Sequence, residues 1–286
     1  MFDTHCHLNF KAFKKILPEI ITSAQEEGVA NILIPGTDVK TSKDGIFIAE
    51  QYDWMYVAVG IHPHHVMKYL RRYAEPSSAS ANEIPDLVRN DVKEIESLLH
   101  HPKVKAVGEI GLDKHVYEQT VYEEYNVDGA FIELQKELFK KQLHLALEYD
   151  KSLILHNREA IEDLIPILKE NWDDKLKGKT VLHCCEPLEE LLSFAKEHQI
   201  YMGVDGDITF IEAKQQFITQ VPAELLVLET DSPFLLPEPL RSQKKYPNKP
   251  ANIKIVAETV AKLRNIPVEE LIEQTSENAK RLFSII

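Results

Sequence analysis

The sequence has few cysteines and no long hydrophobic run. Three cysteines among 286 residues, two of them adjacent at Cys184 and Cys185, do not make the disulfide framework of a small secreted domain. We therefore expect the protein to work in a reducing cytoplasm. No stretch approaches the ~20 apolar residues of a membrane helix, and the first residues lack the basic flank and long apolar segment of a signal peptide. We expect no association with membranes.

Positive charge is also in short supply. Lysine and arginine number 33 against 46 aspartates and glutamates, which gives a formal net charge of −13 at pH 7. This balance argues against a surface that coats nucleic acid or a membrane. It does not exclude a nuclease whose local field is set by bound metal cations.

What the sequence does contain is a repeated alternation of apolar runs and helix-like segments. The runs are rich in valine, isoleucine and leucine and do not alternate with polar residues, which is typical of parallel strands covered on both faces. Eight such units without an internal linker predict an α/β protein, a single (β/α)8 TIM barrel domain spanning residues 1–286. The expected strands are residues 1–3, 31–36, 55–62, 105–113, 152–158, 180–185, 200–206 and 225–231. The expected helices include residues 17–28, 130–150, 186–199 and 253–264.

Two connections look like elaborated loops. Residues 73–90 are rich in proline, serine and alanine, and residues 114–128 are polar and aromatic. They follow the third and fourth expected strands, so both lie on the face where barrels carry their active sites.

The chain opens MFDTHCHLNF, with His5 and His7 one residue apart. Alternate residues of a strand share a face, so both imidazoles project together. The pair alone is weak evidence for a metal site and fits two ordinary solvated or hydrogen-bonded histidines better. The other expected strand ends carry the same residue types, namely His62, His64, Glu109, His156, His183 and Asp231. Because these ends converge in a barrel, we expect a centre for a divalent cation there.

The motifs at these strand ends resemble those of one known family. They read DTHCH, GIHPHH, VGEIGLD, LHNREA, VLHC and LETDSPFLLP, in chain order, and NKPANI follows. In this set the sequence resembles the TatD family of metal-dependent hydrolases, within the amidohydrolase-like superfamily. The resemblance covers essentially the whole chain.

The resemblance implies a deoxyribonuclease of the 3′–5′ exonuclease type, with short or single-stranded DNA ends as substrate. It implies one or two divalent metal ions, Zn²⁺, Mg²⁺ or Mn²⁺, as cofactors. The first would be held by His5, His7 and Asp231 and the second by His156 and His183, with Glu109 as the bridge. The resemblance also places His62 and His64 in contact with substrate and Arg158 near a phosphate.

These residue types suit hydrolysis of a phosphodiester. Two cations ~3.5–4 Å apart clamp a phosphoryl oxygen and activate a bridging water as hydroxide. We expect Asp231 to act as the general base and Glu109 to hold the catalytic metals. Arg158 suits bidentate phosphate binding but fits a surface ion pair as well. We expect Asp113 to orient a ligand rather than bind metal.

Departures from the family pattern leave the substrate open. They fall in residues 184–187 and 114–117 and in the two long loops. The same centre would also serve a hydrolase of a small ester or amide, or a deacylase of aminoacyl-tRNA. A scaffold that keeps metal only for folding is disfavoured, since structural zinc sites are closed Cys/His tetrahedra. The sequence leaves the native metal and the oligomeric state open, and a monomer is compatible with it.

Overall fold

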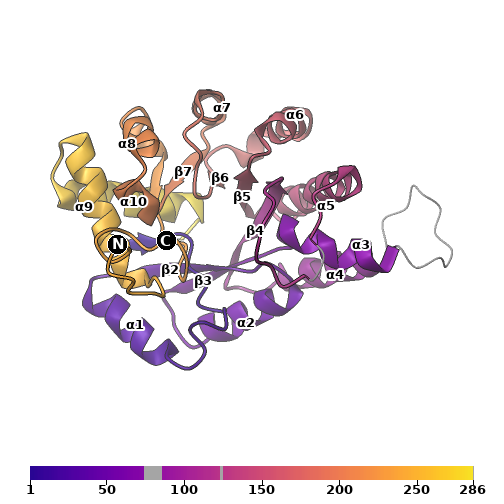
Figure 1. Ribbon diagram of the computed structural model, residues 1–286, viewed down its shortest axis with the longest axis horizontal. Coiled ribbons are helices and arrows are strands. Elements are labelled where there is room, and N and C mark those ends of the chain that lie inside the picture. The colour runs from indigo at the N-terminus through magenta and orange to yellow at the C-terminus, as the bar shows by residue number, and fades with distance from the viewer. Residues whose placement is uncertain (74–85, 123–124, 286) are drawn as a thin grey trace.

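A computed structural model describes residues 1–73, 86–122 and 125–285 of the chain (Figure 1). Eight parallel strands form one sheet in the order β1 to β8. The strands are β1 (Phe2–Asp3), β2 (Asn31–Pro35), β3 (Met55–Val59), β4 (Val104–Asp113), β5 (Ser152–Arg158), β6 (Thr180–Leu182), β7 (Tyr201–Val204) and β8 (Leu226–Leu228).

Helices connect successive strands and surround the sheet (Figure 1). They are α1 (Leu17–Glu26), α2 (Val39–Ala49), α3 (Met67–Tyr73), α4 (Asp86–Leu98), α5 (Gly129–Glu148), α6 (Ile161–Asn171), α7 (Glu189–His198), α8 (Glu212–Ile218), α9 (Ile253–Arg264) and α10 (Val268–Leu282). None of the helices in the described ranges is long and apolar enough to cross a membrane.

The barrel closes between the segments that follow β1 and β8. The Thr4 amide donates to the Leu228 carbonyl at 3.1 Å, and the His7 amide donates to the Ser232 carbonyl at 2.8 Å. Cys6 and Ser232 form a parallel bridge between these two hydrogen bonds. The prediction of a (β/α)8 barrel is confirmed.

The barrel interior is apolar at the N-terminal end of the strands. One small or apolar side chain from each strand contributes to a buried cluster with the end of α10: Phe2, Leu33, Ala58, Ala106, Ile154, Val181, Tyr201, Val227, Ala279, Leu282 and Phe283. The rings of Phe2 and Phe283 lie 5.9 Å apart, so α10 covers this end and brings the two termini together (Figure 1). Polar chemistry is therefore confined to the opposite end.

Several element boundaries differ from those predicted. Strands β3, β6 and β8 end before the polar residues that were expected on them, so His62, His183 and Asp231 follow the strands. Hydrogen bonds between neighbouring segments continue past the last regular strand pair, although the backbone turns at His183 and is left-handed at Asp231 (φ 49°). The prediction that residues 73–90 form a loop is wrong at both ends, since Tyr73 is the last residue of α3 and residues 86–90 begin α4. Residues 74–85 of that loop lie outside the described part of the chain.

Candidate metal centre

Two histidines and a carboxylate that follow β1 and β8 meet a second carboxylate, Glu109, which lies within β4 at a shift of the strand register. The Nε2 atoms of His5 and His7 are 3.2 Å apart. Oε2 of Glu109 lies 3.4 Å from Nε2 of His5, and Oδ1 of Asp231 lies 3.3 Å from Nε2 of His7. All four residues are buried. The predicted first ligand set is therefore assembled at one point.

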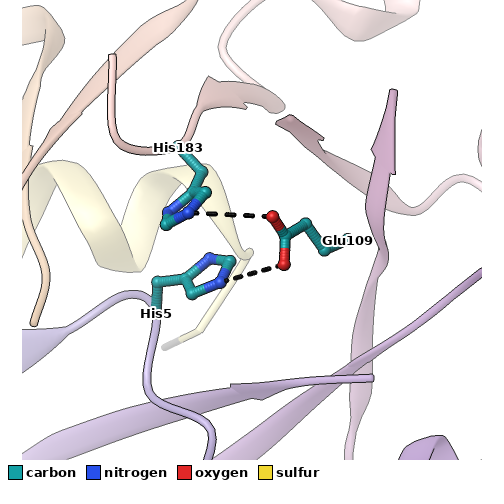
Figure 2. A group of neighbouring side chains, drawn as sticks. All are labelled: His5, Glu109 and His183. Atoms are coloured by element: carbon teal, nitrogen blue, oxygen red, sulfur yellow. Dashed lines mark ion pairs between the residues drawn. The ribbon is translucent and has the colours of Figure 1, made fainter. Parts of the chain in front are cut away.

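The other oxygen of Glu109 faces a second group of imidazoles. Its Oε1 lies 2.8 Å from Nδ1 of His156, 3.4 Å from Nε2 of His62 and 3.7 Å from Nε2 of His183. His5 and His183 stack with ring centroids 3.5 Å apart, and Figure 2 shows both turned toward Glu109. The carboxylate of Glu109 thus stands between two groups of nitrogen donors.

The first group fits a divalent cation. Ligand atoms about 2.1 Å from a tetrahedral zinc lie about 3.4 Å from one another, and the contacts among His5, His7, Glu109 and Asp231 range from 3.2 to 3.8 Å. The Nδ1 atoms of His5 and His7 are buried and have no hydrogen-bond partner. Imidazole nitrogen and carboxylate oxygen are ligands of Zn²⁺ and Mn²⁺. The residues present therefore suit the cation that the sequence predicts.

The electrostatics of the centre show what a cation would replace. Burial opposes ionisation of Glu109, but the surrounding histidines outweigh it and hold its pKa well below the usual value. Burial also opposes protonation of His156 and His183, yet neighbouring carboxylates raise the pKa of His156 to about 9 and that of His183 to about 10. The positive charge of these protonated imidazoles thus balances the negative charge of the buried carboxylates. A metal ion that binds here would displace the protons.

Carboxylates orient two of the imidazoles. Nε2 of His156 lies 3.0 Å from Oδ2 of Asp113, which leaves Nδ1 facing Glu109. Nδ1 of His183 forms an ion-pair contact of 2.9 Å with Oε1 of Glu229 that lacks hydrogen-bond geometry, and its Nε2 faces Glu109. A carboxylate on the far nitrogen of a metal-binding histidine fixes the tautomer that presents a lone pair to the metal. Asp113 therefore lies where its predicted orienting role needs it.

His62 has the opposite arrangement. Its Nδ1 accepts a hydrogen bond from the backbone N–H of His64 at 3.1 Å. In the neutral ring the proton therefore sits on Nε2, the atom that faces Glu109. An Nε2–H group donates a hydrogen bond and has no lone pair for a metal. This favours substrate contact by His62, as the resemblance implies, over a ligand role.

The structure places His64 and Arg158 farther from the carboxylates. The His64 ring stacks on Tyr125 with centroids 4.7 Å apart. The exposed Arg158 guanidinium lies 5.1 Å from the centre of the Tyr117 ring, and the Tyr117 hydroxyl donates to Asp113 at 2.8 Å. The loop of residues 114–128 thus joins the predicted phosphate contact to the centre through an aromatic side chain.

Comparisons with known proteins agree with this geometry. The family model described as TatD related DNase matches residues 2–284. The chain belongs to the TatD family. It is 34% identical over 287 residues to the uncharacterized metal-dependent hydrolase YabD of Bacillus subtilis, covering 100% of this chain and 99% of YabD. It is 30% identical over 290 residues to the 3′-5′ ssDNA/RNA exonuclease TatD of Escherichia coli, covering 100% of this chain and 99% of that protein.

Solved structures show the same relationship. The TatD homologue YJJV of Escherichia coli superposes with a TM-score of 0.82 at 27% identity, covering 100% of this chain and 98% of YJJV. A phosphotriesterase homology protein from Escherichia coli shares the fold alone, with a TM-score of 0.64 at 11% identity, covering 99% of this chain and 98% of that protein. This chain is thus a hydrolase of the TatD family with a TIM-barrel fold.

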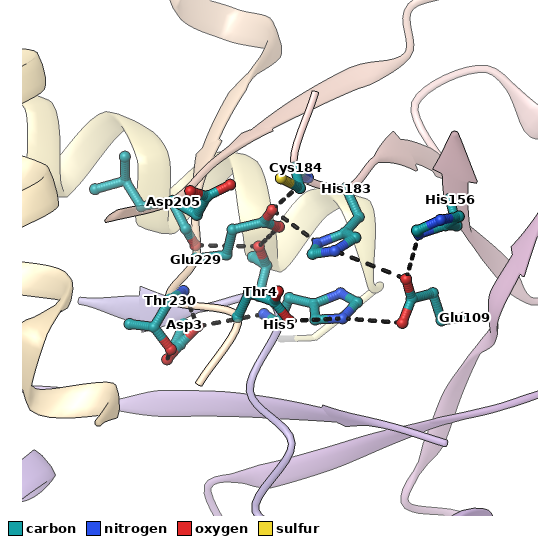
Figure 3. A network of polar contacts seen from close by, with 12 residues as sticks. Asp3, Thr4, His5, Glu109, His156, His183, Cys184, Asp205, Glu229 and Thr230 are labelled. Carbon is teal, nitrogen blue, oxygen red and sulfur yellow. Dashed lines mark hydrogen bonds and ion pairs between the residues drawn. The ribbon is translucent and has the colours of Figure 1, made fainter. Parts of the chain in front are cut away.

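Two acidic residues of this TatD hydrolase that the sequence analysis did not single out support its centre (Figure 3). The buried Glu229 accepts from the Cys184 amide and contacts His183, and a Cβ on Gly203 would lie 2.5 Å from its Oε2. The buried Asp3 accepts from the amide and hydroxyl of Thr230 at 3.0 and 2.7 Å. Their position in the sequence could have indicated this role. Asp3 stands two residues before His5 in DTHCH, and Glu229 stands two residues before Asp231 in LETDSPFLLP.

Cys185 packs in the hydrophobic core, and the half-buried Cys184 accepts from Nζ of Lys214 at 3.4 Å. Burial is the main reason that the pKa of Cys185 rises to about 12 and that of Cys184 rises well above the usual value. Both thiols are therefore protonated at neutral pH, and neither supplies the thiolate that a cysteine nucleophile needs.

Glu229→Gln is expected to weaken Zn²⁺ binding about 10- to 100-fold, the usual cost of removing the carboxylate behind a metal-binding histidine. The amide oxygen still accepts from the Cys184 amide but no longer carries the charge that faces His183. Competition titration with a chromogenic chelator measures the affinity. The exposed Glu190→Gln serves as the matched control, and equal affinities for both variants would refute the role of Glu229.

Proposed function

We propose that this chain is a metal-dependent exonuclease that removes nucleotides from the 3′ end of single-stranded nucleic acid. One observation carries the proposal: Oε2 of Glu109 faces His5 while Oε1 faces His156, with Asp231 beside His7 on the side of the first oxygen. A carboxylate that bridges two divalent cations needs this arrangement. The relatives named as single-stranded DNA and RNA exonucleases support the choice of substrate.

Six residues would hold the cations in this proposal. His5, His7 and Asp231, whose ligand atoms lie within 4.8 Å of one another, would hold the first. His156 and His183, which each form a close group with Glu109 but not with one another, would hold the second, with Glu109 shared between the two. Divalent cations held by these residues would supply positive charge at the scissile phosphate and a water of lowered pKa. The metals that fit this donor set are Zn²⁺ and Mn²⁺, and Mg²⁺ is the further candidate.

The chain's own residues supply the remaining steps. Asp231, whose pKa the neighbouring His7 and His183 hold low despite burial, is ionised and accepts a proton from the attacking water. The Nε2–H of His62 donates to a non-bridging oxygen of the phosphate. Arg158, at the end of β5, binds the next phosphate of the strand. We also propose that residues 1–286 act as one unit in a reducing cytoplasm, since all three cysteines are free.

The test is cleavage of a single-stranded oligonucleotide labelled at either end, with Mg²⁺, Mn²⁺ or Zn²⁺. We expect mononucleotides to be released from the 3′ end and EDTA to stop the reaction. RNA and duplex DNA of the same sequence are compared alongside. If every oligonucleotide stays intact while p-nitrophenyl esters or aminoacyl-tRNA are hydrolysed, the nuclease function is refuted.

A further inference from the structure

The loop that follows β8 returns to its own starting point beside the metal centre. We call residues 233–249 the β8 loop. The amide of Asn248 donates to the Pro233 carbonyl at 3.0 Å, and its side chain donates to the Thr230 carbonyl at 2.9 Å. Both ends of the loop are therefore fixed next to Asp231, and the loop forms one edge of the centre.

An exposed aromatic ring stands at the start of this loop. Phe234 is 49% exposed, although its amide donates to the Asp231 carbonyl at 2.8 Å. Its ring lies 6.2 Å from that of His7 and 6.0 Å from that of Phe10, which itself stacks on His7 at 4.3 Å. A large apolar surface is thus held in solvent against a predicted metal ligand.

The rest of the β8 loop is basic, in contrast to the chain as a whole. Residues 235–249 carry four cationic side chains, Arg241, Lys244, Lys245 and Lys249, against the single acidic Glu238, whereas the net charge of the chain is −13. The side chains of Lys244, Lys245 and Lys249 are exposed, and none of the ion pairs formed in the described ranges includes them. Arg241 lies over the Phe210 ring at 4.3 Å and contacts Glu238. Three positive charges that form no ion pair therefore follow the exposed ring in the sequence.

A second exposed phenylalanine shows that this combination is not general on the surface. Phe47 on α2 is 68% exposed. Both lysines of that helix form ion pairs, Lys40 with Asp44 and Lys43 with Glu94. Within the described surface, the β8 loop is where exposed aromatic rings, Phe234 and Tyr246, and lysines without an ion pair occur in one segment, and that segment begins and ends next to Asp231.

We propose that the β8 loop is the binding track for the single strand, with Phe234 as the platform for the terminal base and Lys244 and Lys245 as phosphate contacts. This inference rests on the proposed nuclease function and names the residues that select its substrate. Stacking on an aromatic ring combined with a cationic backbone contact is how proteins bind single strands without reading sequence. Such a track draws a flexible end toward the centre, although the protein as a whole repels nucleic acid.

Binding of a fluorescent twelve-nucleotide oligothymidine tests the track. Phosphorothioate linkages keep the phosphate charge and slow cleavage, so affinity is measured by anisotropy on the metal-loaded protein. Phe234→Ala is expected to bind about tenfold more weakly, and Phe234→Trp to retain binding. The matched control, Phe47→Ala, is expected to bind like the unmodified protein. Equal metal contents in all three variants show that the centre is intact.

The lysines are tested by salt dependence. Lys244→Gln combined with Lys245→Gln is expected to lower the slope of log affinity against log salt by about 1.4, or about 0.7 for each phosphate that is no longer neutralised. The proposed track is refuted if the salt slope of the affinity is unchanged, or if Phe234→Ala binds the oligonucleotide as tightly as Phe47→Ala. Either result refutes the track even if the protein cleaves DNA. Phe234-dependent binding without cleavage in any metal supports the track and refutes the nuclease function.

Discussion

Replacing Glu109 with glutamine is expected to lower kcat/KM for single-stranded DNA on the order of 1,000-fold, because two-cation catalysis loses its bridge. Oε2 of Glu109 lies 3.4 Å from His5, and Oε1 lies 2.8 Å from His156. A glutamine has one oxygen and no charge, so it can serve only one of the two donor groups. We therefore expect bound metal to fall together with activity.

The measurement is metal content by inductively coupled plasma mass spectrometry on the protein used for the kinetics. Glu170→Gln, an exposed change on α6, is the matched control and is expected to keep both metal and activity. Circular dichroism shows whether the Glu109 variant is folded. If the folded variant keeps its full metal content, Glu109 does not bridge.

Lys214→Met is expected to destabilise the fold by about 3–5 kcal/mol, the cost of leaving buried charge without its partner. The Lys214 side chain is 13% exposed, and its Nζ lies 2.6 Å from Oδ2 of Asp207 and 3.8 Å from Oδ2 of Asp205. Burial opposes its charge, but the two aspartates outweigh burial and raise the pKa of Lys214. Burial and the neighbouring Asp205 raise the pKa of Asp207 to about 7.

Urea unfolding at pH 7, followed by circular dichroism, measures this destabilisation. Lys196→Met, in the exposed last turn of α7, is the matched control and is expected to change stability by less than about 0.5 kcal/mol. The double variant Lys214→Met with Asp207→Asn is expected to recover part of the stability, since one uncompensated charge is removed. A decrease below about 1 kcal/mol for Lys214→Met would show that the lysine does not neutralise the aspartates.

Much of the architecture could be predicted from hydrophobic periodicity. The bounds of β5 and α9 are those predicted, because in each case an uninterrupted pattern is bounded by polar residues. The start of α4 was missed, since the proline- and serine-rich composition before it was extended past Pro85 into the helix. Composition marks where a loop begins better than where the next helix begins.

The positions of the predicted ligands were easier to anticipate than their orientation. Strand ends of a parallel barrel converge whatever their sequence, so polar residues there meet. The backbone amide of His64 that decides the tautomer of His62 cannot be seen in spacing. Nor can the contact of Glu229 with His183, which joins residues 46 apart in sequence across neighbouring parts of the barrel.

The central claim is that two cations at the Glu109 carboxylate act together on a phosphodiester. It is tested most directly by adding Mn²⁺ in steps to EDTA-stripped protein and measuring both bound metal and the rate of nucleotide release from the 3′ end of single-stranded DNA. We predict little cleavage with one bound ion per chain and a steep rise as the second binds. Full activity without bound metal, or no cleavage with two ions bound, would contradict the claim.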